Sequence, residues 1–150
     1  MNPELESFRQ LEFASHPGNL SLVRNFVRQF LEPLEFSGTD RDMIILGLDE
    51  ACTNVIRHAY LHQPDQLICL ACQLQPNGVV FRLRDFGVQS DPAKFSGRPL
   101  ERIRPGGLGI HFIYKAFTQA DYYLRQEGTE LMLFKEFSAP TKPRELPPIK

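Results

Sequence analysis

Apolar residues recur at helical spacing in two stretches of the first half of the chain. Over residues 17–32 they stand three or four positions apart, as on one face of an amphipathic helix, and Pro33 ends the pattern. Thr39 followed by Asp42 resembles an N-terminal cap, and a second helix is predicted from that cap to about residue 61. Its core face is predicted to hold Ile44, Leu48, Ala51, Cys52, Val55 and Ala59.

Shorter apolar stretches have the pattern of strands. An edge strand is predicted at residues 8–13, where three of the six positions are Phe or Leu. Two more are predicted near residues 66–74 and 79–84, and the Asn77-Gly78 pair between them is typical of a tight hairpin.

The second half of the chain predicts one more helix and one more strand pair. The helix begins after Gly107-Leu108-Gly109 and ends near Phe117. The strands cover residues 122–125 and 129–137 and turn at Glu127-Gly128. The order of elements predicts an α/β fold, built as an α+β two-layer sandwich: a mostly antiparallel mixed sheet with helices packed on one face.

The chain has 150 residues, a length typical of one domain. We expect this domain to cover residues 1–137. The tail at residues 138–150 holds four prolines and is predicted to be disordered. Residues 89–105 have no clean periodicity, and an irregular segment of that length inside a domain is more often functional than inert.

Charge and composition exclude several classes of partner. Lysine and arginine total 17 and aspartate and glutamate 18, so the formal charge is −1 and we expect no direct nucleic acid partner. No stretch approaches the ~20 apolar residues that a membrane span needs, and the first residues do not resemble a secretion signal. A cytoplasmic protein with no membrane contact is therefore expected.

The three cysteines do not predict a disulfide framework, because their number is odd. Cys69 and Cys72 lie in a predicted strand, where an odd separation places the two side chains on opposite faces. No second Cys or His pair follows at zinc spacing. We expect buried structural thiols, and neither a zinc nor a redox site.

The second helix carries a polar face beside its core face. Glu50, Asn54 and His58 recur every four residues, and Gly47 on the same side would let something large approach. One interpretation is a solvated face on which Glu50 interacts with Asn54. The other is a ligand site, because a carboxylate and an amide oxygen suit Mg²⁺ or can orient a hydroxyl. The triplet alone leaves both open.

Two glycine-bearing turns add candidate chemistry. Asp85-Phe86-Gly87 follows a strand, where a carboxylate can accept a hydrogen bond from a ligand while the backbone comes near; an ordinary turn is the alternative. The same three letters occur in protein kinases, whose other motifs are absent from this chain. Residues 104–110, Arg-Pro-Gly-Gly-Leu-Gly-Ile, lead into a helix and would offer backbone N–H groups to a phosphate, unless they form only a helix-entry turn.

In this order, the segments resemble the bacterial anti-sigma-factor serine kinases of the GHKL ATPase superfamily, from about residue 20 to residue 137. Residues 48–60, Leu-Asp-Glu-Ala-Cys-Thr-Asn-Val-Ile-Arg-His-Ala-Tyr, are similar to that family's N box. Asp85-Phe86-Gly87 is similar to its first glycine box and residues 106–110 to its second. Gly128-Thr129 resembles the Gly-Thr that opens the final strand of the ATP site. The resemblance implies a Bergerat-type ATP-binding fold.

The resemblance also implies a role for each matching residue. Asn54 would coordinate the Mg²⁺ that bridges the ATP phosphates, and Glu50 would be the general base for a substrate hydroxyl. Asp85 would accept from the adenine amino group, with Gly87 giving the ring room and Thr129 joining through water. Phosphates would be bound under a lid at residues 89–105 by Arg104, Gly106, Gly107, Leu108 and Gly109.

Some positions depart from the family or carry no role in it. Gln89 stands where the first glycine box usually has a second glycine. Arg102 is the other candidate for the phosphate-binding arginine, and Arg104 is preferred although Pro105 follows it. His58 is interpreted as structural, and Asp49 points about 100° away from Glu50, which excludes it as a base.

The function implied by the resemblance is an ATP- and Mg²⁺-dependent serine kinase. It would phosphorylate an anti-anti-sigma protein of the STAS type, sequester a sigma factor and form a homodimer. One alternative is a nucleotide-dependent binding module without phosphotransfer, which Gln89 favours and Glu50 disfavours. An interaction protein with an empty fold is the other, and Asn54 and Gly107-Leu108-Gly109 disfavour it.

Overall fold

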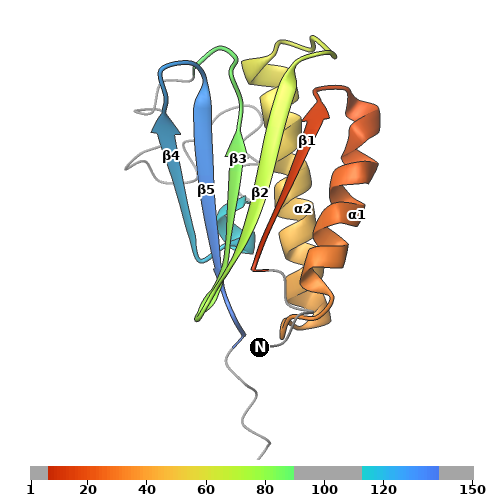
Figure 1. Ribbon diagram of the computed structural model, residues 1–150, viewed down its shortest axis with the longest axis vertical. Coiled ribbons are helices and arrows are strands. Elements are labelled where there is room, and N and C mark those ends of the chain that lie inside the picture. The colour runs from red at the N-terminus through yellow and green to blue at the C-terminus, as the bar shows by residue number, and fades with distance from the viewer. Residues whose placement is uncertain (1–6, 90–112, 139–150) are drawn as a thin grey trace, which may run out of the picture.

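Five strands form one antiparallel sheet in the order β1-β2-β3-β5-β4, and the helices cover one face of it (Figure 1). The computed structural model describes residues 7–89 and 113–138. In chain order the elements are β1 (Phe8–Ala14), the 3-10 turn η1 (Pro17–Asn19), α1 (Leu20–Leu31), α2 (Gly38–Asn54), the π-helical turn η2 (Val55–Ala59), β2 (Leu67–Gln75), β3 (Gly78–Arg84), β4 (Gln119–Leu124) and β5 (Thr129–Glu136). Residues 113–116 add a helical turn. The predicted α/β class, the edge position of the first strand and both hairpins are confirmed.

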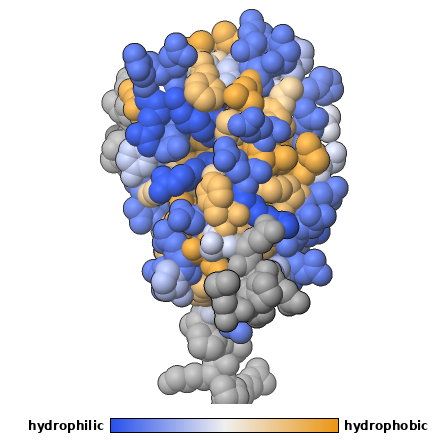
Figure 2. Space-filling model, viewed as in Figure 1, coloured by the Kyte–Doolittle hydropathy of each residue, from blue (hydrophilic) through white to orange (hydrophobic). Residues whose placement is uncertain are grey.

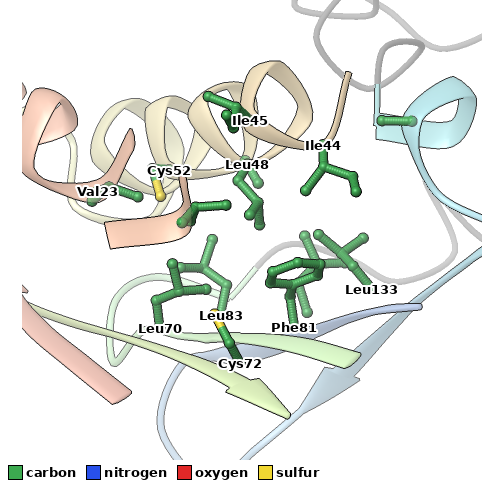
Figure 3. Packing of buried hydrophobic residues seen from close by; sticks show 14 of the residues in the cluster. Val23, Ile44, Ile45, Leu48, Cys52, Leu70, Cys72, Phe81, Leu83 and Leu133 are labelled. Atoms are coloured by element: carbon green, nitrogen blue, oxygen red, sulfur yellow. The ribbon is translucent and has the colours of Figure 1, made fainter. Parts of the chain in front are cut away.

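Buried side chains of the helices and of one sheet face form the core. Val23 of α1 and Ile44, Leu48 and Cys52 of α2 point toward the sheet (Figure 3). The strands meet them with fully buried residues: Ile68, Leu70, Cys72, Val79, Phe81, Leu83 and Leu133. The ring of Phe81 packs edge-on against two more rings, those of Phe30 and Phe117. This apolar layer places α2 directly over the central strands.

The opposite sheet face carries no helix among the described residues, and its side chains are a mixture of polar and apolar (Figure 2). Cys69 lies on this face and is half-buried, whereas Cys72 faces the core and is fully buried. The expected separation of these two thiols on opposite faces is confirmed. All three cysteines are free, and burial raises the pKa of each thiol.

The predicted N-cap of α2 is wrong by two residues. Ser37 is the cap: its backbone is extended, and its Oγ accepts a hydrogen bond from the Asp40 amide at 3.0 Å. Thr39 therefore lies inside the first turn. The side chain of Asp40 is held in that turn by Ser138 Oγ, 2.5 Å away, and by Lys135 Nζ, 3.7 Å away. By local pattern Ser37 and Thr39 are equivalent caps, and the contacts of Asp40 with the end of β5 accompany the use of Ser37.

The predicted second helix ends close to the expected residue, but its last part, η2, is a π-helical turn instead of an α-helix. The Tyr60 amide donates to the Val55 carbonyl, five residues back, at 3.0 Å. The wider turn changes which side chains point to the core, so Ile56 and Tyr60 are buried. Val55 and Ala59, which were predicted for the core face, are only half-buried. Leu61 then adopts a left-handed backbone with φ of 50° and ends the element.

No helix within residues 7–89 or 113–138 has the length and apolar character that a membrane crossing would require. The predicted disordered tail beyond Ser138, most of the irregular segment 89–105 and the predicted start of the third helix lie outside the described residues.

Candidate functional site

Three segments that are far apart in the sequence meet at one end of the sheet. The π-helical turn after α2, the exit of β3 and the turn between β4 and β5 all lie at this end (Figure 1). Hydrogen bonds join them: the Val88 amide donates to the Ala59 carbonyl at 2.8 Å, and the Asp85 amide donates to the Thr129 carbonyl at 3.0 Å. The end of the N-box segment, the first glycine box and the Gly-Thr pair are therefore neighbours.

Asp85 is a buried carboxylate at the centre of this arrangement, with 4% of its surface exposed. Its Oδ1 accepts from the Gly87 amide at 3.0 Å, which holds the side chain in one orientation. The Asp85 carbonyl also accepts from the Thr129 amide at 3.3 Å. Burial raises the pKa of Asp85, although the Gly87 amide and nearby Arg84 oppose the shift. A carboxylate held in this way can accept a hydrogen bond from a buried ligand donor.

Gly87 packs against the end of the N-box segment. A Cβ at this position would lie 2.3 Å from the Ala59 carbonyl oxygen, much closer than van der Waals contact permits. Only glycine lets the two backbones approach this closely, and the Val88–Ala59 hydrogen bond depends on that approach. The further role of giving an adenine ring room stays a prediction.

Tyr60 is a site residue that the sequence interpretation missed. Its Oη accepts from the Phe86 amide at 2.7 Å and donates to the Leu67 carbonyl at 2.5 Å. The side chain is buried, and this burial raises the pKa of the phenol. The available signal was its place as the last residue of the segment that resembles the N box, where a buried hydroxyl needs a partner.

Gly128 and Gln89 complete this end of the sheet. Gly128 has a φ of 73°, and a Cβ there would lie 2.1 Å from the Asp85 carbonyl oxygen. The Nε2 of Gln89 donates to the Arg125 carbonyl at 2.6 Å and to the Gly128 carbonyl at 2.9 Å. The residue that departs from the family pattern is therefore bound to the β4–β5 turn.

Glu50 and Asn54 are half-buried on α2 and stand one turn apart. Within residues 7–89 and 113–138, neither side chain has a hydrogen-bond or ion-pair partner. Asp49 differs: its Oδ1 lies 2.7 Å from Nη1 of Arg24 on α1. Asp49 is therefore engaged in an ion pair, while the side-chain oxygen atoms of Glu50 and Asn54 have no such partner among the residues that the structure describes.

Gly47 does not leave room for a ligand, contrary to the sequence interpretation. A Cβ there would lie 2.8 Å from Cε2 of Phe117 and 2.9 Å from Cβ of Ala116. The missing side chain admits the protein's own helical turn at residues 113–116 and the phenylalanine after it. Sequence periodicity placed Gly47 beside the polar face but could not show which segment packs there.

Several predicted site residues lie outside the part of the chain that the structure describes, so their roles stay predictions. These are Arg102, Arg104, Gly106, Gly107, Leu108 and Gly109. Within the described part, no group of three or more His, Cys, Asp or Glu residues is placed to hold a metal ion. The Asn54 amide oxygen fits Mg²⁺ as a hard donor only together with oxygens of a ligand, which is how proteins commonly bind this ion with nucleotides.

The chain is similar over most of its length to proteins with known roles. It is 27% identical over 133 residues to an anti-sigma F factor of Oceanobacillus iheyensis, covering 85% of this chain and 91% of that protein. It is 21% identical over 141 residues to the serine-protein kinase RsbW of Bacillus cereus, covering 87% of each. A serine/threonine-protein kinase, BtrW of Bordetella bronchiseptica, is 29% identical over 104 residues, which are 67% of this chain and 72% of that protein.

A solved structure and a family profile agree with these relatives. The structure of the RsbU and RsbW domains of Rv1364c from Mycobacterium tuberculosis matches with a TM-score of 0.63 and 18% identity, over 88% of this chain and 33% of that longer chain. This match shows the shared fold. The profile of the histidine kinase-like ATPase domain matches residues 13–135. With that match over most of its length, the chain belongs to the histidine kinase-like ATPase domain family.

Proposed function

We propose that this chain is an ATP- and Mg²⁺-dependent protein serine kinase that phosphorylates a STAS-type anti-anti-sigma protein and sequesters a sigma factor. One observation carries the proposal: the turn that holds Asp85 and Gly87 is joined on both sides. Its Asp85 backbone pairs with Thr129, and the amides of its neighbours Phe86 and Val88 donate to Tyr60 and Ala59, at the end of the helical segment that bears Glu50 and Asn54. The names of the relatives, an anti-sigma F factor and two protein kinases, support this activity and these partners.

Asp85 and Thr129 would bind the adenine end of ATP. The buried carboxylate of Asp85 would accept from the exocyclic amino group, and the Thr129 side chain would join through water. A buried acceptor held in one orientation discriminates strongly between ligands, because a ligand without a donor leaves it unpaired. GTP has no amino group at that ring position and would therefore bind more weakly.

Glu50 and Asn54 would act at the phosphate end. When bound, Mg²⁺ neutralises charge on the phosphates, and the Asn54 amide oxygen would help to hold it. The Glu50 carboxylate would take the proton of the substrate serine hydroxyl. A general base must be free to accept a proton, and within the described residues Glu50 has no ion pair that would prevent this.

A nucleotide-dependent binding module without phosphotransfer is the second candidate. Gln89 favours it, because this residue replaces a glycine of the first glycine box. The two candidates share the nucleotide site and differ only in whether Glu50 acts as the general base of a phosphotransfer reaction. Either protein would act in the cytoplasm, and we expect a homodimer, which light scattering after size exclusion would test.

The deciding experiment measures Mg-ATP binding by calorimetry and phosphotransfer to a STAS-type partner from radiolabelled ATP. Glu50→Gln should bind ATP as the wild type does but transfer at least ~10²-fold more slowly. Asn54→Ala should lose the Mg²⁺-dependent part of ATP binding. Asp42→Asn, an exposed carboxylate on the same helix, is the matched control and should leave both measurements unchanged.

Each outcome has a distinct meaning. Wild-type protein that binds Mg-ATP but modifies no partner would favour the binding module. Glu50→Gln protein that transfers phosphate at the wild-type rate would show that Glu50 is not the base. Wild-type protein that binds no nucleotide in the presence of Mg²⁺ would overturn both candidates.

A further inference from the structure

Gln89 uses both N–H bonds of its side-chain amide on one turn. Nε2 lies 2.6 Å from the Arg125 carbonyl oxygen and 2.9 Å from the Gly128 carbonyl oxygen. Both partners can only accept, so the amide must present its nitrogen to them. The Arg125 amide donates to the same Gly128 carbonyl at 3.1 Å, which closes the turn on itself. The two hydrogen bonds of the Gln89 side chain, called the tie below, thus link the exit of β3 to a turn 36 residues later in the chain.

The other bonds of the segment 85–89 show what this tie adds. Near its start, the Phe86 amide is held by Tyr60 Oη and the Val88 amide by the Ala59 carbonyl, both at the end of the N-box segment. On the side of β5, the backbone pair of Asp85 and Thr129 is the first attachment. The Gln89 amide is the second, four residues further on. With both attachments in place, the β4–β5 turn cannot rotate about the Asp85–Thr129 pair.

We infer that Gln89 is a positioning residue for the base-binding end of the nucleotide site, which rests on the proposed function. By holding Gly128 against the exit of β3, its amide keeps the side chain of Thr129 at a set spacing from the Asp85 carboxylate. The Asp85–Thr129 backbone pair fixes the residue after Gly128, and the Gln89 amide fixes the carbonyls of Gly128 and Arg125 on the other side of the turn.

This role reverses the expectation drawn from the family pattern. A glycine at position 89 would match the first glycine box but would carry no side-chain donor and would leave the Arg125 and Gly128 carbonyls to water. The substitution Gln89→Gly should therefore weaken adenine recognition. If position 89 only needs to be small, the same substitution should strengthen nucleotide binding.

The test compares Gln89→Glu, Gln89→Gly and Gln126→Glu in the full-length protein. Gln89→Glu keeps the shape but removes both donors and sets a charge against two carbonyl oxygens. Gln126→Glu is the matched control: it adds the same charge within the exposed turn that Gln89 contacts, and Gln126 makes no side-chain hydrogen bond within the described residues. Dissociation constants for ATP and GTP with Mg²⁺ are measured for each protein, with the unfolding temperature.

Both Gln89 variants should bind ATP about tenfold more weakly, since a pair of hydrogen bonds is lost. GTP binding should change less than about threefold, because GTP does not pair with the carboxylate that the tie positions. The ratio of the two affinities should therefore fall, whereas Gln126→Glu should keep it. If Gln89 had a merely structural role, its substitution would weaken the binding of ATP and GTP equally.

Hydrogen exchange in nucleotide-free protein gives a second readout that does not depend on the proposed function. The amides of Arg125 and Thr129 should exchange faster in both Gln89 variants than in the wild type and in Gln126→Glu. Unchanged exchange, an unchanged ATP-to-GTP ratio or tighter ATP binding by Gln89→Gly would each overturn the inference. If the wild type binds no nucleotide while exchange responds as expected, the tie exists but its role in base recognition is wrong.

Discussion

Tyr60 and Phe86 are joined by a hydrogen bond from the Phe86 amide to the Tyr60 hydroxyl, 2.7 Å long. The same hydroxyl donates to the Leu67 carbonyl, so one side chain connects the end of the N-box segment, the start of β2 and the exit of β3. The π-helical turn makes this possible, because it rotates Tyr60 into the core instead of leaving it on the solvent side. The candidate site thus depends on a local irregularity in the helix that carries it.

Replacing Tyr60 by phenylalanine keeps the ring and removes the hydroxyl. The Phe86 amide and the Leu67 carbonyl then lose a partner, and we expect the free energy of unfolding to fall by about 1–3 kcal/mol. Urea denaturation followed by circular dichroism measures this. Tyr123→Phe serves as the control, since Tyr123 is 39% exposed and its loss of a hydroxyl should cost less than about 0.5 kcal/mol. Equal stability of the two variants would contradict the connecting role of Tyr60.

Gly87→Ala should be strongly destabilising, because the added Cβ would meet the Ala59 carbonyl oxygen at 2.3 Å and neither backbone can move independently. We expect a loss of at least about 2 kcal/mol. Gly38→Ala is the matched control: it lies at the start of α2 with nothing within 4 Å of the added Cβ, and should be neutral or stabilising by up to about 1 kcal/mol. Thermal unfolding of the two variants makes the comparison, and tolerance of Gly87→Ala would show that the box is not packed against Ala59 in solution.

The stability of the protein should depend on the ionisation of Asp85. Burial raises the pKa of this carboxyl above 3.8, so the fold favours its protonated form. The ionisation of Asp85 therefore lowers the stability of the wild type as pH rises through the interval between the unfolded and folded pKa values, and Asp85→Asn lacks this contribution. We expect the stability of Asp85→Asn relative to the wild type to increase from about pH 3 to about pH 7.

Urea titrations of both proteins across that range measure the difference, in which the other titrating groups cancel. Calorimetry on the same samples should show that Asp85→Asn has lost ATP binding. A stability difference that is constant with pH would contradict the raised pKa, and retained ATP binding would contradict the role of Asp85 in the site.

Asp49→Asn provides a contrast with Glu50→Gln at the neighbouring position. The Arg24–Asp49 pair is partly exposed, with 40% and 24% of the two side chains accessible, so its loss should cost less than about 1 kcal/mol. ATP binding and phosphotransfer should remain those of the wild type. A kinase assay run beside that of Glu50→Gln checks this, and a comparable loss of rate in both variants would remove the distinction between the two carboxylates.

Much of the fold was predictable because it follows from local pattern. The spacing of apolar residues in α1 and the alternation in β2 and β5 match the elements that the structure shows. The errors fall where a tertiary contact selects between local choices. Ser37 and Thr39 are both acceptable caps, and the contacts of Asp40 with the end of β5 accompany the choice of Ser37.

For the candidate site, the sequence by itself determined the identity and order of the chemical groups: Glu50 and Asn54 one helical turn apart, Asp85 at a strand exit, and a glycine before Thr129. Only the tertiary structure decided how they meet. In the structure Gly47 packs against Phe117 and Gly87 packs against Ala59. The side chain of Gln89 donates a hydrogen bond to the turn between β4 and β5. The reason is physical: residue spacing specifies which side of its own helix or strand a group occupies, while packing between elements specifies what lies opposite it.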